Sequence, residues 1–274
     1  MKAFNNFAFL FLCICYLNFS NTELYAQCTT NNAFKAGEVI RYDISYQWGI
    51  IWVEAGDVFF SVQKANFAGG DVFHFYSYGK TKPFWDGMFK VRDEYQSYTD
   101  AKTFEPYYST RKTLEGNFWA NDKTTFDYST NKIYANTNNA ERKKKTDTLQ
   151  MKPCTLDLLT AIYYARNIDF TKLSKKQTFP FTVVIDNGIF ELYGRYLGQE
   201  ELILPNKKKF KTLKFSALLI EGTIFKGGED MTVWVSDDPN HVPLLVDAKI
   251  LIGSVKAYMT SYSGLKYPLS SEIK

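Results

Sequence analysis

Apolar and polar residues alternate along most of this chain, and this alternation constrains its fold more than any other feature. The stretch Glu38–Trp48 shows the pattern clearly, because every second residue is apolar. The apolar residues on its one face are Ile40, Tyr42, Ile44, Tyr46 and Trp48. Successive side chains of a β-strand point to opposite faces, so the segment is predicted to be a half-buried strand of an antiparallel sheet.

Similar segments follow, separated by residues that are typical of tight turns. Hairpin turns are predicted at Gly69–Gly70, Asp186–Gly188 and Pro205–Lys207. Some strands are apolar on both sides, as Leu244 and Leu245 illustrate, so both faces must be covered by a curled sheet, a helix or a bound apolar molecule. The predicted fold class is mainly β: a large, strongly curved antiparallel sheet or an open or half barrel, with one main helix packed on or in it.

One segment near the middle breaks the alternation and is predicted to be that helix, at about residues 155–167. Its apolar positions recur at three-and-four spacing and are Leu158, Leu159, Ile162 and Tyr163, followed by Arg166. Thr155 is the expected N-cap, and Asp157 falls in the first turn, where the helix dipole favours an anion. The apolar stripe either packs against the sheet, which we favour, or acts as a lid over an apolar cavity.

The first residues have the composition of a secretory signal. The apolar run Phe7–Phe19 follows a basic residue and is about a dozen residues long, which is too short for a membrane span. Cleavage is expected after Ala26, so residues 1–26 are predicted to be removed and residues 27–274 to form a single β-rich domain. No later run is long and apolar enough to predict a transmembrane helix.

Two cysteines stay in the chain after signal removal, Cys28 and Cys154. Two cysteines in an oxidising compartment are expected to be joined, so a structural disulfide is predicted between them. The alternative is that Cys154 is a small buried residue and Cys28 a loose terminal thiol. The sequence has no pair with CxxC spacing in this part of the chain, so redox catalysis is not indicated.

The charge balance favours no particular partner. The chain has 33 basic and 29 acidic residues, a net charge of +4. The basic clusters Arg142–Lys145 and Lys207–Lys209 lie beside turn signals, and we interpret them as solvated loop tips rather than phosphate or headgroup sites. Aromatic residues are frequent, but a strongly basic face is missing, so nucleic-acid binding is not expected.

Catalytic motifs are scarce. Only two histidines occur, His74 and His241, and the sequence lacks GxSxG, HExxH and P-loop patterns. Asp237, Asp238 and His241 are weak candidates for acid–base or metal chemistry, although the same residues are ordinary turn formers, which is the interpretation that we favour. Whether the chain is an enzyme stays open, with the balance against it, and we expect no cofactor and no bound metal.

Three segments together resemble a known family. They are AFKAGEVIRYDISYQWGIIWVEAGDVFFSV, the helix CTLDLLTAIYYAR, and MTVWVSDDPNHVPLLVDAKILIGSVKAYMTSYSG near the end. With the exported start, they resemble the exported bacterial family catalogued as domain of unknown function 3108, over most of Phe34 to Leu265. The resemblance implies a strongly curved antiparallel sheet, similar in outline to the half-barrels of periplasmic lipoprotein carriers. It implies no catalytic residue.

These features lead to an expected location and three functional hypotheses. The protein is expected in the periplasm of a Gram-negative bacterium; the alternatives are a lipid anchor on Cys28, which the bulky Gln27 disfavours, or secretion. The first hypothesis is a non-catalytic binding or carrier protein for an apolar, lipid-like ligand, with the helix as a candidate lid. The second is an envelope scaffold that binds a protein partner without a small ligand. A hydrolase-type enzyme is the third.

Overall fold

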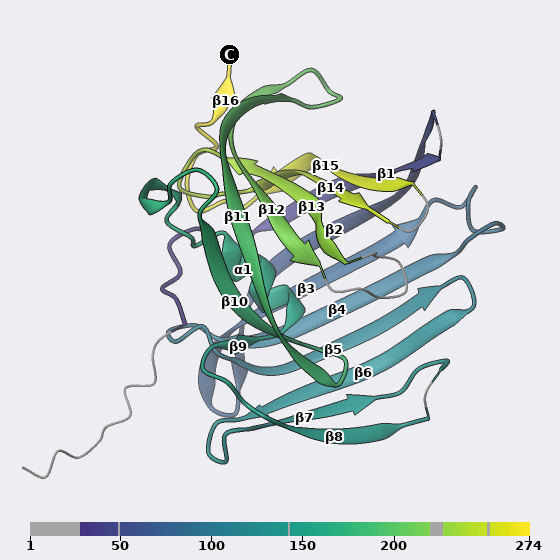
Figure 1. The fold of residues 1–274 in the computed structure, drawn as a ribbon, viewed down its shortest axis with the longest axis vertical. Helices are drawn as coiled ribbons and strands as arrows, with labels where there is room; N and C mark the ends of the chain where they lie inside the picture. Colours follow the sequence, from purple (N-terminus) through teal and green to yellow (C-terminus); the bar gives the residue numbers. More distant parts are fainter. Residues whose placement is uncertain (1–27, 49, 142, 220–226, 251–252) are drawn as a thin grey trace, which may run out of the picture.

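The computed structural model describes residues 28–48, 50–141, 143–219, 227–250 and 253–274 (Figure 1). The strands before the helix are β1 (Val39–Trp48), β2 (Ile51–Phe67), β3 (Gly70–Thr81), β4 (Val91–Asp100), β5 (Pro106–Glu115), β6 (Phe118–Asp127), β7 (Lys132–Thr137), β8 (Lys145–Gln150) and β9 (Thr155–Leu156). The helix α1 (Leu158–Ala165) and the 3-10 turn η1 (Phe170–Lys172) follow. The remaining strands are β10 (Thr178–Ile185), β11 (Gly188–Ile203), β12 (Lys209–Leu219), β13 (Gly228–Ser236), β14 (Pro243–Lys249), β15 (Ser254–Ser263) and β16 (Glu272–Ile273).

All of these strands belong to one sheet. Its order is β8-β7-β6-β5-β4-β3-β2-β1-β15-β14-β13-β12-β11-β10-β9, with β16 paired to β12. Neighbours are antiparallel except β9 and β10, which are parallel. The sheet is strongly curved but does not close. Its two end strands, β8 and β9, do not pair with each other among the described residues. The predicted fold class, a large curved antiparallel sheet with one helix, is confirmed.

The helix lies inside the curl of the sheet. It contacts β3 and β4 on one side and β10 on the other, so the two arms of the sheet enclose it (Figure 1). Tyr163 stacks on Phe75 with ring centroids 4.1 Å apart and meets the edge of Phe34 at 4.9 Å. Because one helix has to bury its apolar stripe and the two arms have to bury theirs, enclosing α1 satisfies all three surfaces together.

The β10–β11 hairpin contacts the opposite arm of the sheet, β6 and β7, through side chains. Val184 and Ile189, on the β10–β11 hairpin, pack against Phe126 and Ile133 of β6 and β7. The ion pair between Lys152 and Glu191, 2.6 Å between charged atoms, lies at the same seam. The hairpin therefore meets β6 and β7 through side chains, while its backbone pairs with β9 and β12.

The local predictions hold for the strands and need correction at the helix. Ile40 and Tyr42 are buried on the core side of β1, as the alternation predicts. The prediction of Thr155 as N-cap is wrong: Thr155 lies in β9 and pairs with β10, and the helix begins later. Asp157 is the N-cap, since its carboxylate accepts hydrogen bonds from the backbone N–H groups of Leu159 and Thr160.

Candidate functional site

A small cavity lies between the sheet and the N-terminal end of α1. Its volume is about 70 Å³. The side chains that line it include Tyr95, Arg111, Asp122, Asp157, Leu158, Leu159 and Asp186. The lining is mixed, and its charged members come from β5, β6, the helix cap and the β10–β11 turn.

Arg111 forms ion pairs with two of the carboxylates at this cavity. Its Nη2 lies 2.5 Å from an oxygen of Asp122 and 2.5 Å from an oxygen of Asp186. The other oxygen of Asp122 accepts the backbone N–H of Asn138 at 2.9 Å. Asp186 lies in the turn that joins β10 and β11, so Arg111 links that hairpin to β5 and β6. The group is an internal ion-pair network in which one guanidinium faces two carboxylates.

Asp157 anchors the helix to β4. Its Oδ2 accepts hydrogen bonds from the hydroxyls of Ser97 at 2.6 Å and Thr160 at 2.7 Å, and Thr99 bonds to Thr160 at 2.7 Å. All four residues are buried. Burial raises the pKa of the Asp157 carboxyl above its ordinary value, although these hydrogen bonds oppose the shift. The role of Asp157 is therefore to cap and fix α1.

A second carboxylate pair lies further along the same face of β4 and β5, at Asp93 and Glu115. One oxygen of Asp93, Oδ1, is buried and has no hydrogen-bond partner among the described residues. Burial, followed by the charge of Glu115, raises the pKa of Asp93 to about 7, and the backbone N–H of Leu114 opposes this only in part. The pair therefore holds a proton at a pH where an ordinary aspartate has lost it.

This shift predicts a pH dependence of stability. The folded state holds the Asp93 proton up to pH of about 7 while the unfolded chain releases it near pH 4, so the free energy of unfolding falls as the pH rises between these values. Replacing Asp93 by Asn should stabilise the fold at pH about 8 by about 1–2 kcal/mol, a value reduced for partial exposure, and change little at pH about 4. Urea unfolding at both pH values measures this. Equal effects at the two pH values would contradict it.

The Asp237–Asp238–His241 cluster is a structural turn between β13 and β14. Asp238 accepts hydrogen bonds from the Ser236 hydroxyl at 3.0 Å, from the Asn240 backbone at 3.0 Å and from the Ser271 backbone at 3.2 Å. Asp237 instead accepts from the side chain of Gln199 at 3.0 Å. Among the described residues, no group of three His, Cys, Asp or Glu side chains is placed to hold a metal ion.

His241 is tied to the end of the helix rather than to the two aspartates. Its Nδ1 lies 2.7 Å from the backbone carbonyl of Arg166, which can only accept, so Nδ1 carries the proton. Burial lowers the pKa of His241 below its ordinary value. The ring also meets Phe170 edge-on at 5.3 Å. The imidazole therefore serves as a neutral packing group with one hydrogen bond.

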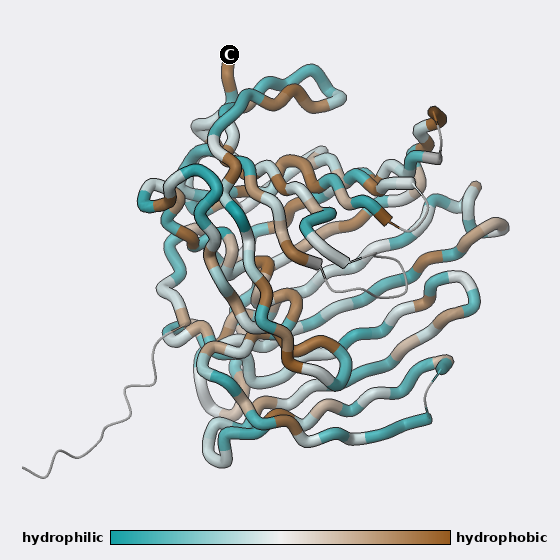
Figure 2. The backbone as a smooth tube through the Cα atoms, viewed as in Figure 1, coloured by the Kyte–Doolittle hydropathy of each residue, from teal (hydrophilic) through white to brown (hydrophobic). Residues whose placement is uncertain are grey.

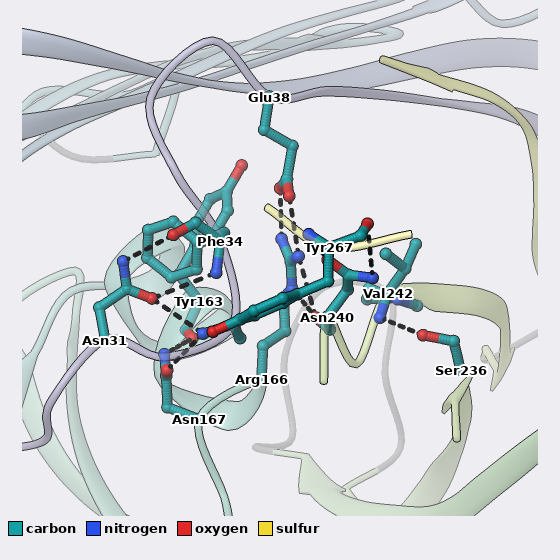
Figure 3. A network of polar contacts seen from close by, with 12 residues as sticks. Asn31, Phe34, Glu38, Tyr163, Arg166, Asn167, Ser236, Asn240, Val242 and Tyr267 are labelled. Atoms are coloured by element: carbon teal, nitrogen blue, oxygen red, sulfur yellow. Dashed lines mark hydrogen bonds and ion pairs between the residues drawn. The ribbon is translucent and has the colours of Figure 1, made fainter. Parts of the chain in front are cut away.

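A buried ion pair beside this turn has no counterpart among the predicted sites. Arg166 and Glu38 are 2 % and 1 % exposed, and two nitrogens of Arg166 lie 2.5 Å and 3.0 Å from the two carboxylate oxygens of Glu38 (Figure 3). Arg166 also donates two hydrogen bonds to the carbonyl of Asn240, at 3.1 Å and 3.0 Å. The side chain of Asn240 in turn holds the backbone of Tyr267. This network joins the start of β1, the helix end, the β13–β14 turn and the C-terminal segment.

The two cysteines lie against each other. Both are thiols in the structure, and the sulfurs of Cys28 and Cys154 are in hydrogen-bond contact. This contact raises the pKa of Cys28, and burial raises it further, whereas the hydrogen bond from Cys28 lowers the pKa of Cys154. The backbone N–H of Cys28 donates to the carbonyl of Thr103 at 3.1 Å, which fixes the start of the described chain. The disulfide itself stays a prediction.

The four candidate lid residues have different surroundings. Leu159 and Tyr163 are buried in the aromatic cluster with Phe34 and Phe75. Ile162 is partly buried against the same cluster. Leu158 is exposed and lines the small cavity. The apolar side of α1 is thus occupied by side chains of the sheet and of the segment before β1.

Large apolar side chains are exposed at one end of the sheet, in the β1–β2 turn, at the start of β2 and in the β3–β4 loop. We name this set the apolar rim; it consists of Ile50, Ile51, Trp52, Phe84, Met88 and Phe89. Ile50 is 97 % exposed, Phe84 82 % and Met88 79 %. Figure 2 shows hydrophobic colour at both of these connections, on the same side of the molecule. Several large apolar side chains exposed at one end of a protein indicate a site of interaction.

A curved, unclosed antiparallel sheet with a helix in its curl defines a β-barrel-like protein, and a solved structure agrees. The crystal structure of a beta-barrel-like protein of domain of unknown function DUF1849 from Brucella abortus is similar to this chain with a TM-score of 0.55. The similarity covers 84 % of this chain and 99 % of that chain, at 9 % sequence identity, so it concerns the fold alone.

The sequence family is also shown. The model of the family described as protein of unknown function (DUF3108) matches residues 41–260, and the chain belongs to this family. None of the curated proteins matches the chain. Within the described residues, no helix has the length and apolar character that a membrane crossing requires.

Proposed function

We propose that this protein is an exported, non-catalytic binding protein of the cell envelope that attaches to another envelope component through the apolar rim. The observation that carries the proposal is the high exposure of Ile50, Phe84 and Met88 on two adjoining connections. Apolar side chains of this size are normally buried, because covering one contributes roughly 1.5–3 kcal/mol. Their joint exposure at one end supports an interaction there rather than chemistry in the interior.

The packed interior supports attachment over storage of a ligand beneath the helix. Small-molecule sites have volumes of roughly 300–1,000 Å³. The cavity beside α1, at about 70 Å³, is far smaller and is lined by Arg111 and three aspartates. A lipid chain would not find the room at this position, and it would meet charged side chains there.

An apolar-ligand carrier is the second candidate, and a different surface supports it. Ile44, Val58 and Val246 are half-buried on the core-facing side of β1, β2 and β14. Together they offer a partly covered apolar stripe on the concave side of the sheet. A carrier would hold its ligand along this stripe.

The placement of Cys28 supports a soluble exported form over a lipid anchor. A lipidated cysteine has to present its sulfur to a bilayer. The sulfur of Cys28 instead contacts that of Cys154, and its backbone N–H is bonded to Thr103. Removal of residues 1–26 would leave this arrangement intact, since the described chain begins at Cys28.

Site-specific photo-crosslinking in cells tests the proposal. A photoreactive residue at Met88 should give a discrete adduct that disappears when Phe84 is replaced by Ser, because the rim then loses its main apolar anchor. The same residue at Thr130, exposed in the β6–β7 turn at the opposite end, is the matched control and should give none. Equal yields at the two positions would refute attachment through the rim. Organic extraction of the purified protein with mass spectrometry would return a lipid only for the carrier.

A further inference from the structure

We infer that the partner of the apolar rim is the surface of an anionic lipid bilayer, which the protein contacts with its β1–β2 turn and β3–β4 loop. This inference rests on the proposed function and specifies the partner of the same surface. The rim supplies the apolar contact, and lysines at the same strand ends supply the attraction to anionic headgroups.

Hydrogen bonds and an ion pair hold the β3–β4 loop of the rim against β2. The Trp85 indole N–H donates to the carbonyl of Glu54 at 3.0 Å, and the backbone N–H of Lys82 donates to the carbonyl of Ala55 at 2.9 Å. Lys82 also forms an ion pair with Glu54. These contacts fasten the β3–β4 loop to β2 at Glu54 and Ala55, so both connections lie at the same end of the sheet (Figure 1). With its polar atoms used inward, the loop presents Phe84 and Met88 to the outside.

Exposed basic side chains occur at the same end of the sheet as the rim. Lys80 and Lys90 flank the β3–β4 loop, and Lys143 and Lys144 lie in the β7–β8 loop at the same end of the sheet. All four are exposed and form no ion pair within the part of the chain that the structure describes, whereas Lys82, Arg92 and Lys145 at this end are paired. Unpaired lysines close to an anionic membrane each contribute about 1 kcal/mol of attraction, and the attraction is screened by salt.

A shallow hollow adds an aromatic–cationic site to this end. It has a volume of about 360 Å³ and is lined by Trp119, Lys143 and Lys144, by one carboxylate, Glu141, and by residues 138–140. Trp119 is itself exposed. Tryptophan is enriched at the headgroup level of membranes because its ring is apolar and its N–H is polar. Trp119 beside two lysines therefore has the chemistry of a site for an anionic headgroup.

The shape of the rim favours a bilayer over a protein surface. Its most exposed side chains stand on separate connections, and Ile50 is almost fully exposed. A protein partner would need a matching pocket for each tip, since protein interfaces are packed as closely as interiors. A bilayer is deformable and accepts apolar tips of different heights while its headgroups meet the lysines.

Vesicle flotation with the chain from Gln27 onward, which contains every described residue, tests the inference. The protein should float with vesicles that contain about 30 % phosphatidylglycerol in phosphatidylcholine, and bind pure phosphatidylcholine several-fold less strongly. Raising the salt concentration from about 0.05 M to about 0.5 M should weaken binding to the anionic vesicles. The double substitution Phe84→Ser and Met88→Ser should lower the partition coefficient at least about tenfold.

Two further sets of variants separate the apolar contribution to membrane binding from the electrostatic one. Ile203→Ser removes another exposed apolar side chain, 61 % exposed at the end of β11 and outside the rim, and should leave binding unchanged. The pair Lys143→Glu and Lys144→Glu should reduce binding to anionic vesicles and spare the weak binding to neutral ones. Because all of these side chains are exposed, every variant should have the same thermal unfolding midpoint as the wild type.

The outcomes distinguish the bilayer from the broader proposal. Failure of the wild type to float, or equal flotation of the rim variant, overturns the inference. If a rim-dependent adduct in cells is a protein and the vesicles do not bind, attachment through the rim stands and the bilayer is excluded. If neither an adduct nor flotation depends on the rim, both proposals fall.

Discussion

Replacing Arg166 by Met is expected to lower the free energy of unfolding by about 3–5 kcal/mol. The substitution leaves the carboxylate of Glu38 buried with no cation, at a position that is 1 % exposed. It also removes both hydrogen bonds to the carbonyl of Asn240. A buried charge that loses its partner keeps the full cost of its desolvation, so the loss exceeds the net value of the pair itself.

The double variant Glu38→Leu with Arg166→Met separates these two effects. Removing both charges together removes the unpaired carboxylate, so the double variant should be more stable than Arg166→Met alone. It should stay below the wild type, because the Asn240 carbonyl still loses its donors, at a cost of about 1–3 kcal/mol. Urea unfolding followed by tryptophan fluorescence measures the free energy of unfolding of the wild type, the single variant and the double variant.

An exposed ion pair provides the matched control. Lys152 and Glu191 are 2.6 Å apart at the seam of the curl, and both side chains are largely in solvent. Lys152→Ala should cost less than about 1 kcal/mol. A similar loss for Lys152→Ala and Arg166→Met, or a double variant as unstable as the sum of its single variants, would contradict the assignment of the Arg166 pair as an organising contact.

The strands could be predicted because their pattern is local. Alternation places Ile40 and Tyr42 on the core side of β1, and the glycine and asparagine turns fall where hairpins occur. β8 escaped prediction because its sequence KTDTLQ is polar on both sides. It is the last strand on one edge of the sheet, where little apolar surface has to be buried and polar residues discourage unwanted pairing.

The first residue of the helix and the buried ion pair could not be predicted from the sequence, because both depend on contacts between distant segments. Thr155 and Asp157 are both good cap residues, and pairing of Thr155 with β10 decides between them. Glu38 and Arg166 are 128 positions apart, so no local spacing connects them. Arg166 does follow the apolar stripe of the helix at the expected interval, and a charge at such a position signals a buried partner without identifying it.

The candidate site was harder to predict than the fold because proximity in sequence does not establish contact between side chains. Asp237, Asp238 and His241 are neighbours along the chain, yet their side chains bond to Gln199, Ser236 and Arg166 respectively. The rim, in contrast, had a signal in the sequence. The segment Phe84–Phe89 carries apolar residues with no strand or helix period between two strands, and unperiodic apolar residues in a loop suggest an exposed contact surface.

Oxidising Cys28 and Cys154 to a disulfide is expected to give the second large effect, raising the free energy of unfolding by about 2–4 kcal/mol. The bridge would close a loop spanning 154 − 28 = 126 positions. Loop-closure entropy sets an upper value near 5 kcal/mol for such a length, and bridges usually deliver less. Reduction should lower the unfolding midpoint without abolishing the fold, because a core of this size does not depend on one cross-link.

The surroundings of the two sulfurs also predict how the bridge forms. The thiolate is the attacking species in thiol–disulfide exchange. Because the two sulfurs are in contact, whichever thiol first reacts with an oxidant such as oxidised glutathione should lose the glutathione to the other sulfur, which closes the bridge. Either single variant, Cys28→Ser or Cys154→Ser, should therefore trap a mixed disulfide with glutathione on the cysteine that remains.

Alkylation and mass spectrometry of the protein, purified without reductant, show whether Cys28 and Cys154 are joined. A bridged chain from Gln27 onward has no thiol to alkylate, because Cys28 and Cys154 are its only cysteines. In the Cys154→Ser variant, reductant should leave the unfolding midpoint unchanged, which separates the bridge from any general effect of the reductant. Two alkylated cysteines in the native protein would contradict both the bridge and passage through an oxidising compartment, since thiols already in contact would be joined there.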